Sequence, residues 1–302
     1  MKHTLKITLW LVLIFFIAQI IGLSVTNKYI DHKKTALTGN IAFEKLPYNL
    51  ERPEIKESIS YIWIMVGVIA GTLILLLLIK FKKMFLWKLW FFLAVFSTTA
   101  IAFAAFMNSF LAAILAFALA LMKVYKPIAF MQNLTEIFIY GGLAAIFVPI
   151  INVFAAFMLL ILISVYDIIA VKRTKHMITL AKFQTKSKVF AGLFISYNKK
   201  APTAIKAMKK IEKNAEGSEK GKIAVLGGGD IGFPLIFAGV IMKGLMLTNT
   251  EIIGFLKALI IPVCATIALL FLLIKGKKDK FYPAMPYLSA GCFIGYAILA
   301  MM

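Results

Sequence analysis

Acidic residues are scarce in this sequence, with 13 Asp and Glu against 34 Lys and Arg, which leaves a formal net charge of +21. Cysteine is scarcer still, because only Cys264 and Cys292 are present, both in apolar runs and without a Cys-x-x-Cys pair. The three histidines, His3, His32 and His176, have no metal-ligand spacing. We therefore expect no disulfide framework and no metal or other cofactor.

Apolar residues are what the sequence has in excess. They make up 62% of the chain and the mean hydropathy is +0.91, whereas soluble domains are nearer to half apolar. This composition predicts an all-α, multi-pass integral membrane protein. In a soluble protein the basic excess would suggest nucleic acid, but in a membrane protein it indicates cytoplasmic loops. The expected partner is therefore the lipid bilayer and not nucleic acid.

Nine segments are apolar and long enough to be predicted as transmembrane helices. They cover approximately residues 5–25, 59–79, 87–106, 109–124, 134–148, 150–171, 223–247, 253–274 and 287–301. The first is interpreted as an uncleaved anchor, because no small-residue cleavage motif closes it. We expect one membrane domain over residues 1–302, in which 1–171 hold six spans, 172–222 form a basic loop and 223–302 hold three spans.

The distribution of basic residues predicts the orientation of these spans. With the N-terminus in the cytoplasm, 26 of the 34 Lys and Arg fall in cytoplasmic segments, 14 of them in residues 172–222. Cytoplasmic loops carry the excess of Lys and Arg in membrane proteins. The sequence therefore predicts a cytoplasmic N-terminus and an outside C-terminus. Lys123 and Lys126 are expected to extend their amines from span ends toward water.

Two acids, Asp167 and Asp230, are interpreted as the only ones clearly inside apolar runs, where a charged Asp costs about 2.5–3.5 kcal/mol. Asp167 precedes Lys172 by five residues, roughly 7.5 Å of helix, and Asp230 follows Lys222 by eight, roughly 12 Å. Consecutive spans would therefore bring both carboxyl groups to a similar depth below one face. We expect them to face each other in a wet pocket within the membrane.

Two close carboxyl groups suit aspartic proteolysis, because they share one proton. The ionised group takes a proton from water, which attacks the peptide carbonyl, while the protonated group donates to the carbonyl oxygen. Two alternatives stay open at this point. Asp167 could be a helix-end residue that is neutral or paired with Lys172, and Asp230 could belong to a proton or ion relay in a transporter.

The stretch "GGGDIG" around Asp230 also fits the dinucleotide-binding pattern Gly-x-Gly-x-x-Gly after a short strand-like "IAVL". That fold needs an amphipathic helix next, but the residues after Gly232 are apolar on all faces and include Pro234. We therefore reject a dinucleotide site. Glycine lets a backbone approach closely, and "IAVL" could pair as a strand with an extended substrate.

Three motifs together resemble the presenilin and signal peptide peptidase family of GxGD-type intramembrane aspartyl proteases, most closely its microbial presenilin homologues. They are "VYDIIAV", "LGGGD" and "YPAMPY", in this order on the sixth, seventh and ninth predicted spans. The resemblance implies cleavage of transmembrane helices of single-span proteins or of signal-peptide remnants, without a cofactor. A prepilin-type peptidase is similar only in the GxGD motif. A homo-oligomer is left open.

The same resemblance assigns roles to individual residues. Asp167 and Asp230 match the catalytic pair, and the residues that match the family's substrate site are Tyr166, Gly227, Gly229, Pro283, Ala284 and Met285. Met285 stands where the family has Leu, and its volume and apolarity are similar. Because proline resists a continuous helix, residues 281–287 are expected to be irregular and to lie beside the two acids.

The predicted orientation can be tested by cysteine labelling. We expect Ser218→Cys, in a variant lacking Cys264 and Cys292, to react with a membrane-impermeant thiol reagent only after cells are permeabilised, because residues 172–222 would face the cytoplasm. Labelling of intact cells would mean that the orientation is inverted and that the signal peptide peptidase branch is the better match.

Overall fold

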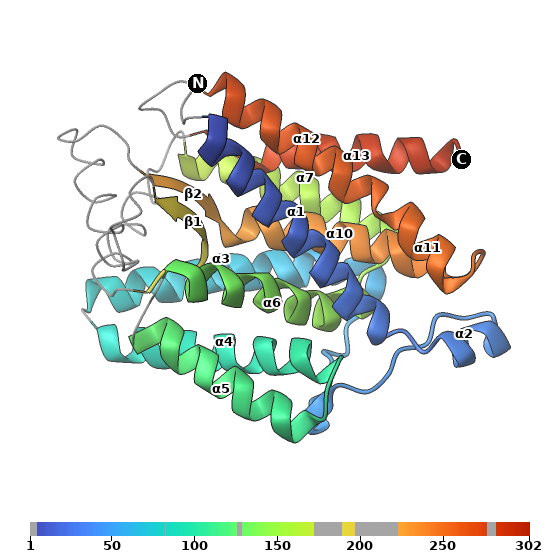
Figure 1. Ribbon diagram of the computed structural model, residues 1–302, viewed down its shortest axis with the longest axis horizontal. Coiled ribbons are helices and arrows are strands. Elements are labelled where there is room, and N and C mark those ends of the chain that lie inside the picture. The colour runs from blue at the N-terminus through green and yellow to red at the C-terminus, as the bar shows by residue number, and fades with distance from the viewer. Residues whose placement is uncertain (1–4, 82, 126–128, 172–188, 197–222, 277–281) are drawn as a thin grey trace.

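The protein is described by a computed structural model in which helices run side by side and a small sheet lies at one end (Figure 1). The described residues are all except 1–4, 82, 126–128, 172–188, 197–222 and 277–281. The elements are α1 (Leu5–Lys28), α2 (His32–Thr38), α3 (Ser60–Lys80), α4 (Met84–Ala104), α5 (Ser109–Tyr125), α6 (Ala129–Phe147), α7 (Val153–Ile169), β1 (Gly192–Ser196), β2 (Ile223–Gly227), α10 (Gly228–Leu245), α11 (Glu251–Ala258), α12 (Ile260–Lys275) and α13 (Met285–Ala300). Short 3-10 turns cover Pro47–Asn49, Glu57–Ile59 and Val148–Ile150.

Within the described residues, six helical stretches are long and apolar enough to cross a membrane, and three shorter apolar helices accompany them. The shorter ones are Ser109–Tyr125, Val153–Ile169 and Met285–Ala300. Each of the nine predicted segments overlaps one of these stretches, so the apolar helical character is confirmed. The number of membrane crossings and the side that each end faces stay predictions.

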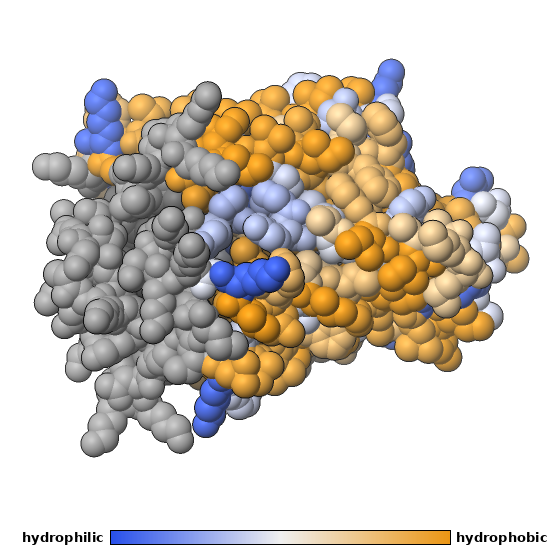
Figure 2. All heavy atoms as spheres, turned by 90° about the horizontal axis from the view of Figure 1, so that it is seen from above, coloured by the Kyte–Doolittle hydropathy of each residue, from blue (hydrophilic) through white to orange (hydrophobic). Residues whose placement is uncertain are grey.

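The helix α1 crosses in front of the bundle in Figure 1 and packs against α6, α10 and α12. The helix α13 packs against α12, and α4 and α5 pack together beyond α6. In contrast, none of the most apolar window of α3 is buried. Apolar side chains also cover much of the face seen in Figure 2, as expected for a surface whose solvent is lipid.

Small residues allow the closest helix contacts. On α5, Ala112, Ala116 and Ala120 recur every four residues and are fully buried, so they form one face against the neighbouring helices. On α6, a Cβ atom added to Gly142 would lie 1.9 Å from the backbone oxygen of Thr98 on α4. Membrane helices associate through such small residues because lipid provides no hydrophobic driving force between helices.

The two strands form an antiparallel hairpin-like sheet whose register pairs Gly192 with Gly227 and Ser196 with Ile223. The predicted seventh span at 223–247 is therefore wrong in its first part, because residues 223–227 are a strand and the helix begins at Gly228. The β-branched and aliphatic side chains of "IAVL" favour a strand, which the sequence had left open.

The start of the last helix also differs from the prediction of an irregular 281–287 segment. Residues 282–284 are irregular, but α13 already begins at Met285, with Pro286 in its first turn. Proline is compatible with this position because the first helical N–H groups have no partner within the helix. The correction is therefore that Pro286 starts the helix instead of interrupting it.

The close approach at Gly142 predicts a specific stability effect. Gly142→Ala should destabilise the bundle by about 1–3 kcal/mol, because α4 and α6 would have to separate. Gly67→Ala on α3 is the matched control, because nothing lies within 4 Å of its added Cβ. Thermal unfolding in detergent would measure both, and equal midpoints would contradict the close-packed contact.

Candidate active site

Asp230 lies in the first turn of α10, directly after the strand β2. The helix begins after Gly227, and the backbone N–H of Gly227 donates a hydrogen bond to the Asp230 carboxyl group. An acid three residues into a helix commonly caps the helix start in this way, and it also meets the positive end of the helix dipole. The transition from strand to helix therefore fixes where the carboxyl group lies.

The first turn of α10 is tied to α1 by one buried side chain. Gln19 on α1 donates from Nε2 to the backbone oxygen of Ile231 at 2.9 Å, and Gln19 is fully buried. Four residues after Asp230, Pro234 has no N–H to give to the Asp230 carbonyl. The turn that carries Asp230 therefore relies on tertiary hydrogen bonds in addition to those of the helix.

Asp167 lies near the end of α7, and its partners come from the start of α13. The backbone N–H of Met285 donates to Asp167 Oδ2 at 3.1 Å, and the N–H of Ala284 is a second donor. A further link between these helices is the contact of 2.8 Å between the hydroxyl groups of Ser164 and Ser289. The turn was predicted to lie beside both acids, and the structure places it beside Asp167.

Asp167 lies on α7 and Asp230 on α10, and these two helices pack against each other. Both residues are half-buried. Two carboxyl groups that approach each other can hold one proton between them. The arrangement can therefore present an ionised group and a protonated group to the same small region.

The glycines around Asp230 have different environments. A Cβ atom at Gly227 would lie 3.3 Å from Asp230 Oδ2, and one at Gly228 would lie 2.6 Å from the hydroxyl oxygen of Tyr140. At Gly229 the nearest contact would be an ordinary 3.4 Å to Phe233. The tightest position is therefore Gly228, which sequence reasoning did not single out because it is the variable residue of the motif.

Tyr166 precedes Asp167 in the chain, but its hydroxyl group reaches another helix. It lies 3.1 Å from the hydroxyl oxygen of Thr72 on α3. Pro283 stands in the irregular segment before α13, one residue before Ala284. Tyr166 therefore connects α7 to α3, and Pro283 precedes the start of α13, which donates to Asp167.

The predictions for Lys123 and for the number of acids within apolar helices are wrong. Lys123 does not extend to water, because it is 1% exposed and pairs with Glu136. Glu136 is a third acid within an apolar helix, since α6 begins at Ala129 and Glu136 is also 1% exposed. The predicted span at 134–148 placed Glu136 near its end, so it was not counted with Asp167 and Asp230. Lys126 lies outside the described residues.

Family comparison identifies the class of protein to which this chain belongs. The family model described as "Signal-peptide peptidase, presenilin aspartyl protease" matches residues 34–302. The chain belongs to this family. It is therefore an intramembrane aspartyl protease and an integral multi-pass membrane protein. A search of curated proteins gives no match.

Solved structures agree with the family in fold. A presenilin family intramembrane aspartate protease in space group C222 is 20% identical, with a TM-score of 0.59 over 97% of this chain and 98% of that one. The same kind of protease in space group P2 is 20% identical, with a TM-score of 0.58 and 97% of each chain covered. At this identity the similarity establishes a common fold, and the site residues have to be argued from this chain's own geometry.

The site is built from carboxyl groups and backbone donors. Among the described residues, no group of three or more His, Cys, Asp or Glu is arranged to hold a metal ion. The groups described at the site, two acids and the backbone donors of Gly227, Ala284 and Met285, can transfer protons and form hydrogen bonds.

Substitutions of Met285 should distinguish the contribution of its side chain to stability from that of its backbone N–H group. Met285→Leu should cost less than about 1.5 kcal/mol, because the volume is conserved and the N–H donor to Asp167 remains. Met285→Ala should cost about 2–5 kcal/mol through a cavity at this buried position. Unfolding in detergent measures both effects. If Met285→Leu were as damaging as Met285→Ala, side-chain shape and not volume would control this turn.

Proposed function

We propose that this chain is a GxGD-type intramembrane aspartyl endopeptidase in which Asp167 and Asp230 are the catalytic pair. The observation that carries the proposal is that these two acids lie on helices α7 and α10, which pack against each other, with a backbone donor on each acid. Charged residues within membrane helices are costly and usually functional. Two of them placed together match the requirement of aspartic proteolysis for one ionised and one protonated carboxyl group.

The reaction would hydrolyse a peptide bond with these two groups and one water molecule. The ionised carboxylate accepts a proton from water, and the water oxygen attacks the carbonyl carbon, while the protonated carboxyl group donates to the carbonyl oxygen. The tetrahedral intermediate then collapses, the C–N bond breaks, and the departing nitrogen takes a proton from the acid pair. Atoms balance with a new carboxyl group and a new amine, and no covalent enzyme intermediate forms.

The substrate class would be the transmembrane helix of a single-span protein or a signal-peptide remnant. A peptide bond inside a helix has to become extended before an acid pair can reach it. The strand β2 pairs with β1 on one side and is the edge of a two-stranded sheet within the described residues. An extended substrate segment could add to the other edge of β2, which would bring its backbone toward Asp230.

The remaining assignments follow from what surrounds the acids. Gly227 would allow the substrate backbone to approach Asp230, and Gly229, which is exposed, would leave space on the same turn. Pro283, Ala284 and Met285 would shape the other side of the substrate site through the backbone donors to Asp167. Tyr166 would align α7 with α3 through Thr72.

The alternative is a transporter or ion-leak pathway in which the same two acids relay protons or ions. Acids in membrane helices serve such relays as well. The two functions differ in a direct observable, because a relay carries flux and leaves a substrate chain intact. Membership of an aspartyl protease family favours proteolysis.

The catalytic assignment predicts that Asp167→Asn and Asp230→Asn each abolish cleavage of a labelled single-span peptide by purified protein in detergent. Neither acid can act as both the base and the acid in the attack of water. Asp31→Asn is a matched control, because Asp31 caps the start of α2 by accepting from the Lys34 N–H at 2.9 Å, and asparagine caps equally well.

Three outcomes separate the hypotheses. Loss of cleavage in both active-site variants, with normal activity in Asp31→Asn and unchanged unfolding, supports the acid pair. Appreciable cleavage by either active-site variant, free of contaminating protease, would sink the assignment. Proton or ion flux through vesicles with an intact peptide would instead favour the relay.

A further inference from the structure

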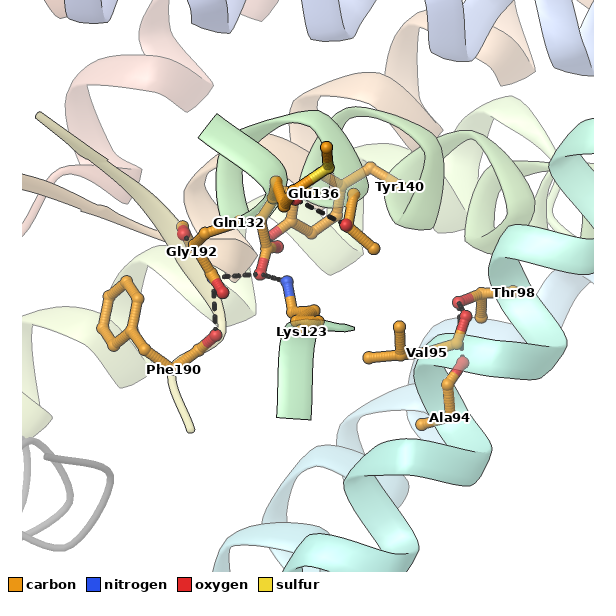
Figure 3. Close-up of polar contacts among 11 residues, drawn as sticks. Ala94, Val95, Thr98, Lys123, Gln132, Glu136, Tyr140, Phe190 and Gly192 are labelled. Carbon is orange, nitrogen blue, oxygen red and sulfur yellow. Dashed lines mark hydrogen bonds and ion pairs between the residues drawn. The ribbon is translucent and has the colours of Figure 1, made fainter. Parts of the chain in front are cut away.

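A second group of charged and polar residues is buried beside the proposed active site (Figure 3). Lys123 on α5 pairs with Glu136 on α6, and both side chains are 1% exposed. Taking two charges out of water costs several kcal/mol per ion, and an apolar replacement of such a pair is often neutral or stabilising. Helix packing alone therefore gives no reason for this pair.

Glu136 is the centre of a network of four residues, namely Lys123, Gln132, Glu136 and Tyr140. Its Oε1 accepts from Lys123 Nζ and from Gln132 Nε2, the latter at 3.0 Å, and its Oε2 accepts from the Tyr140 hydroxyl group. Both oxygens of Glu136 are therefore occupied by donors. The network fixes the orientation of two further side chains, Gln132 and Tyr140, which lie four residues before and after it on α6.

Gln132 connects the network to the strand β1. Its Nε2 also donates to the backbone oxygens of Phe190, at 2.8 Å, and Gly192, at 3.3 Å (Figure 3). Gly192 is paired with Gly227 in the sheet, and the Gly227 N–H donates to Asp230. One arm of the network thus leads through the sheet to the residue that caps the proposed catalytic acid.

Tyr140 connects the network to the same turn from a second side. A Cβ atom on Gly228 would lie 2.6 Å from the Tyr140 hydroxyl oxygen, and one on Gly232 would lie 3.5 Å from its ring. Gly228 and Gly232 lie one turn apart on α10, so the ring of Tyr140 covers one face of the helix start. The two arms therefore meet at Gly227 and Gly228, which immediately precede the Gly-Asp pair.

We propose that Glu136 is a positioning residue that, through Gln132 and Tyr140, holds Gly227 and Gly228 in the geometry that places the Asp230 carboxyl group for reaction. The proposal rests on the proposed function, because it assumes that Asp230 is catalytic. Misplacement of a catalytic group by about 1 Å can cost roughly a hundredfold in rate. A network anchored on a buried ion pair could prevent such a displacement in a turn where helix hydrogen bonds are incomplete.

Two double variants test whether hydrogen bonding at position 136 matters separately from charge. Lys123→Met with Glu136→Gln, and Lys123→Met with Glu136→Leu, both remove the ion pair and leave no buried unpaired charge. The Gln variant can still accept from Tyr140, so its kcat should stay within about threefold of the parent. The Leu variant cannot accept this hydrogen bond, so its kcat should fall roughly ten- to hundredfold, with an unchanged KM.

The readout must separate positioning from stability. Unfolding in detergent is measured for both variants, and affinity for a hydroxyl-containing transition-state mimic is compared with affinity for the uncleaved substrate. Mispositioning of Asp230 should weaken the mimic in parallel with kcat/KM and leave substrate affinity unchanged. If folded Leu and Gln variants cleave equally fast and bind the mimic equally well, the network only joins helices and the proposal is wrong.

A single-hydroxyl variant keeps the proposal testable if the Leu variant fails to fold. Tyr140→Phe should lower kcat about tenfold, because Tyr140 loses its bond to Glu136 while its ring stays over Gly228. Tyr29→Phe is the matched control, because its buried hydroxyl group donates to the Ile101 backbone oxygen at 2.7 Å, in a different cluster of the bundle. Equal rates in the two variants would overturn the proposal.

Asp230→Asn is measured in parallel to keep the two hypotheses apart. If Asp230→Asn still cleaves, the proposed function fails, whatever the network variants do. If Asp230→Asn is inactive while Tyr140→Phe behaves like Tyr29→Phe, the proposed function stands and only the positioning role fails.

Discussion

A carboxyl group inside a helical membrane bundle depends on protein hydrogen-bond donors, because lipid offers none. Within a helix nearly every backbone N–H is already used, and only the first turn has free donors. The structure meets this constraint at two helix starts. Asp230 accepts from Gly227 where α10 begins, and Asp167 accepts from Met285 where α13 begins. The non-helical residues before α10 and α13 therefore determine where the bundle can stabilise these two acids.

This constraint explains why the main features of the site could be predicted from sequence. Asp167 and Asp230 stand out because a carboxyl group is rare in an apolar run, and the flanking basic residues give their depth. The prolines around Ala284 mark a break in helix, and a break at membrane depth has to lie against protein or a wet cavity. Carboxyl groups and broken helices are both costly within a membrane, so Asp167, Asp230 and the turn around Ala284 each stand out in the sequence.

The buried pair of Glu136 and Lys123 and the strand β1 were harder to predict from the sequence. Glu136 lies near the start of the predicted span at 134–148 and follows polar residues such as Gln132, so the sequence did not mark it as a buried acid, although its side chain finds partners within the protein. Lys123 resembled an ordinary basic residue at a helix end, and only the fold shows that it meets Glu136. The strand β1 lies in a long polar segment, and its pairing with β2 depends on residues distant in sequence. Such features require knowledge of which helices are neighbours.

The pairing of Ser196 with Ile223 has a consequence for how the chain length could vary between related proteins. Residues 197–222 join two points that the sheet holds side by side, so both ends of this connection are fixed independently of its length. Residues added between the two strands leave this pairing unchanged, whereas a single residue added within β2 would turn the side chains that follow it to the opposite face.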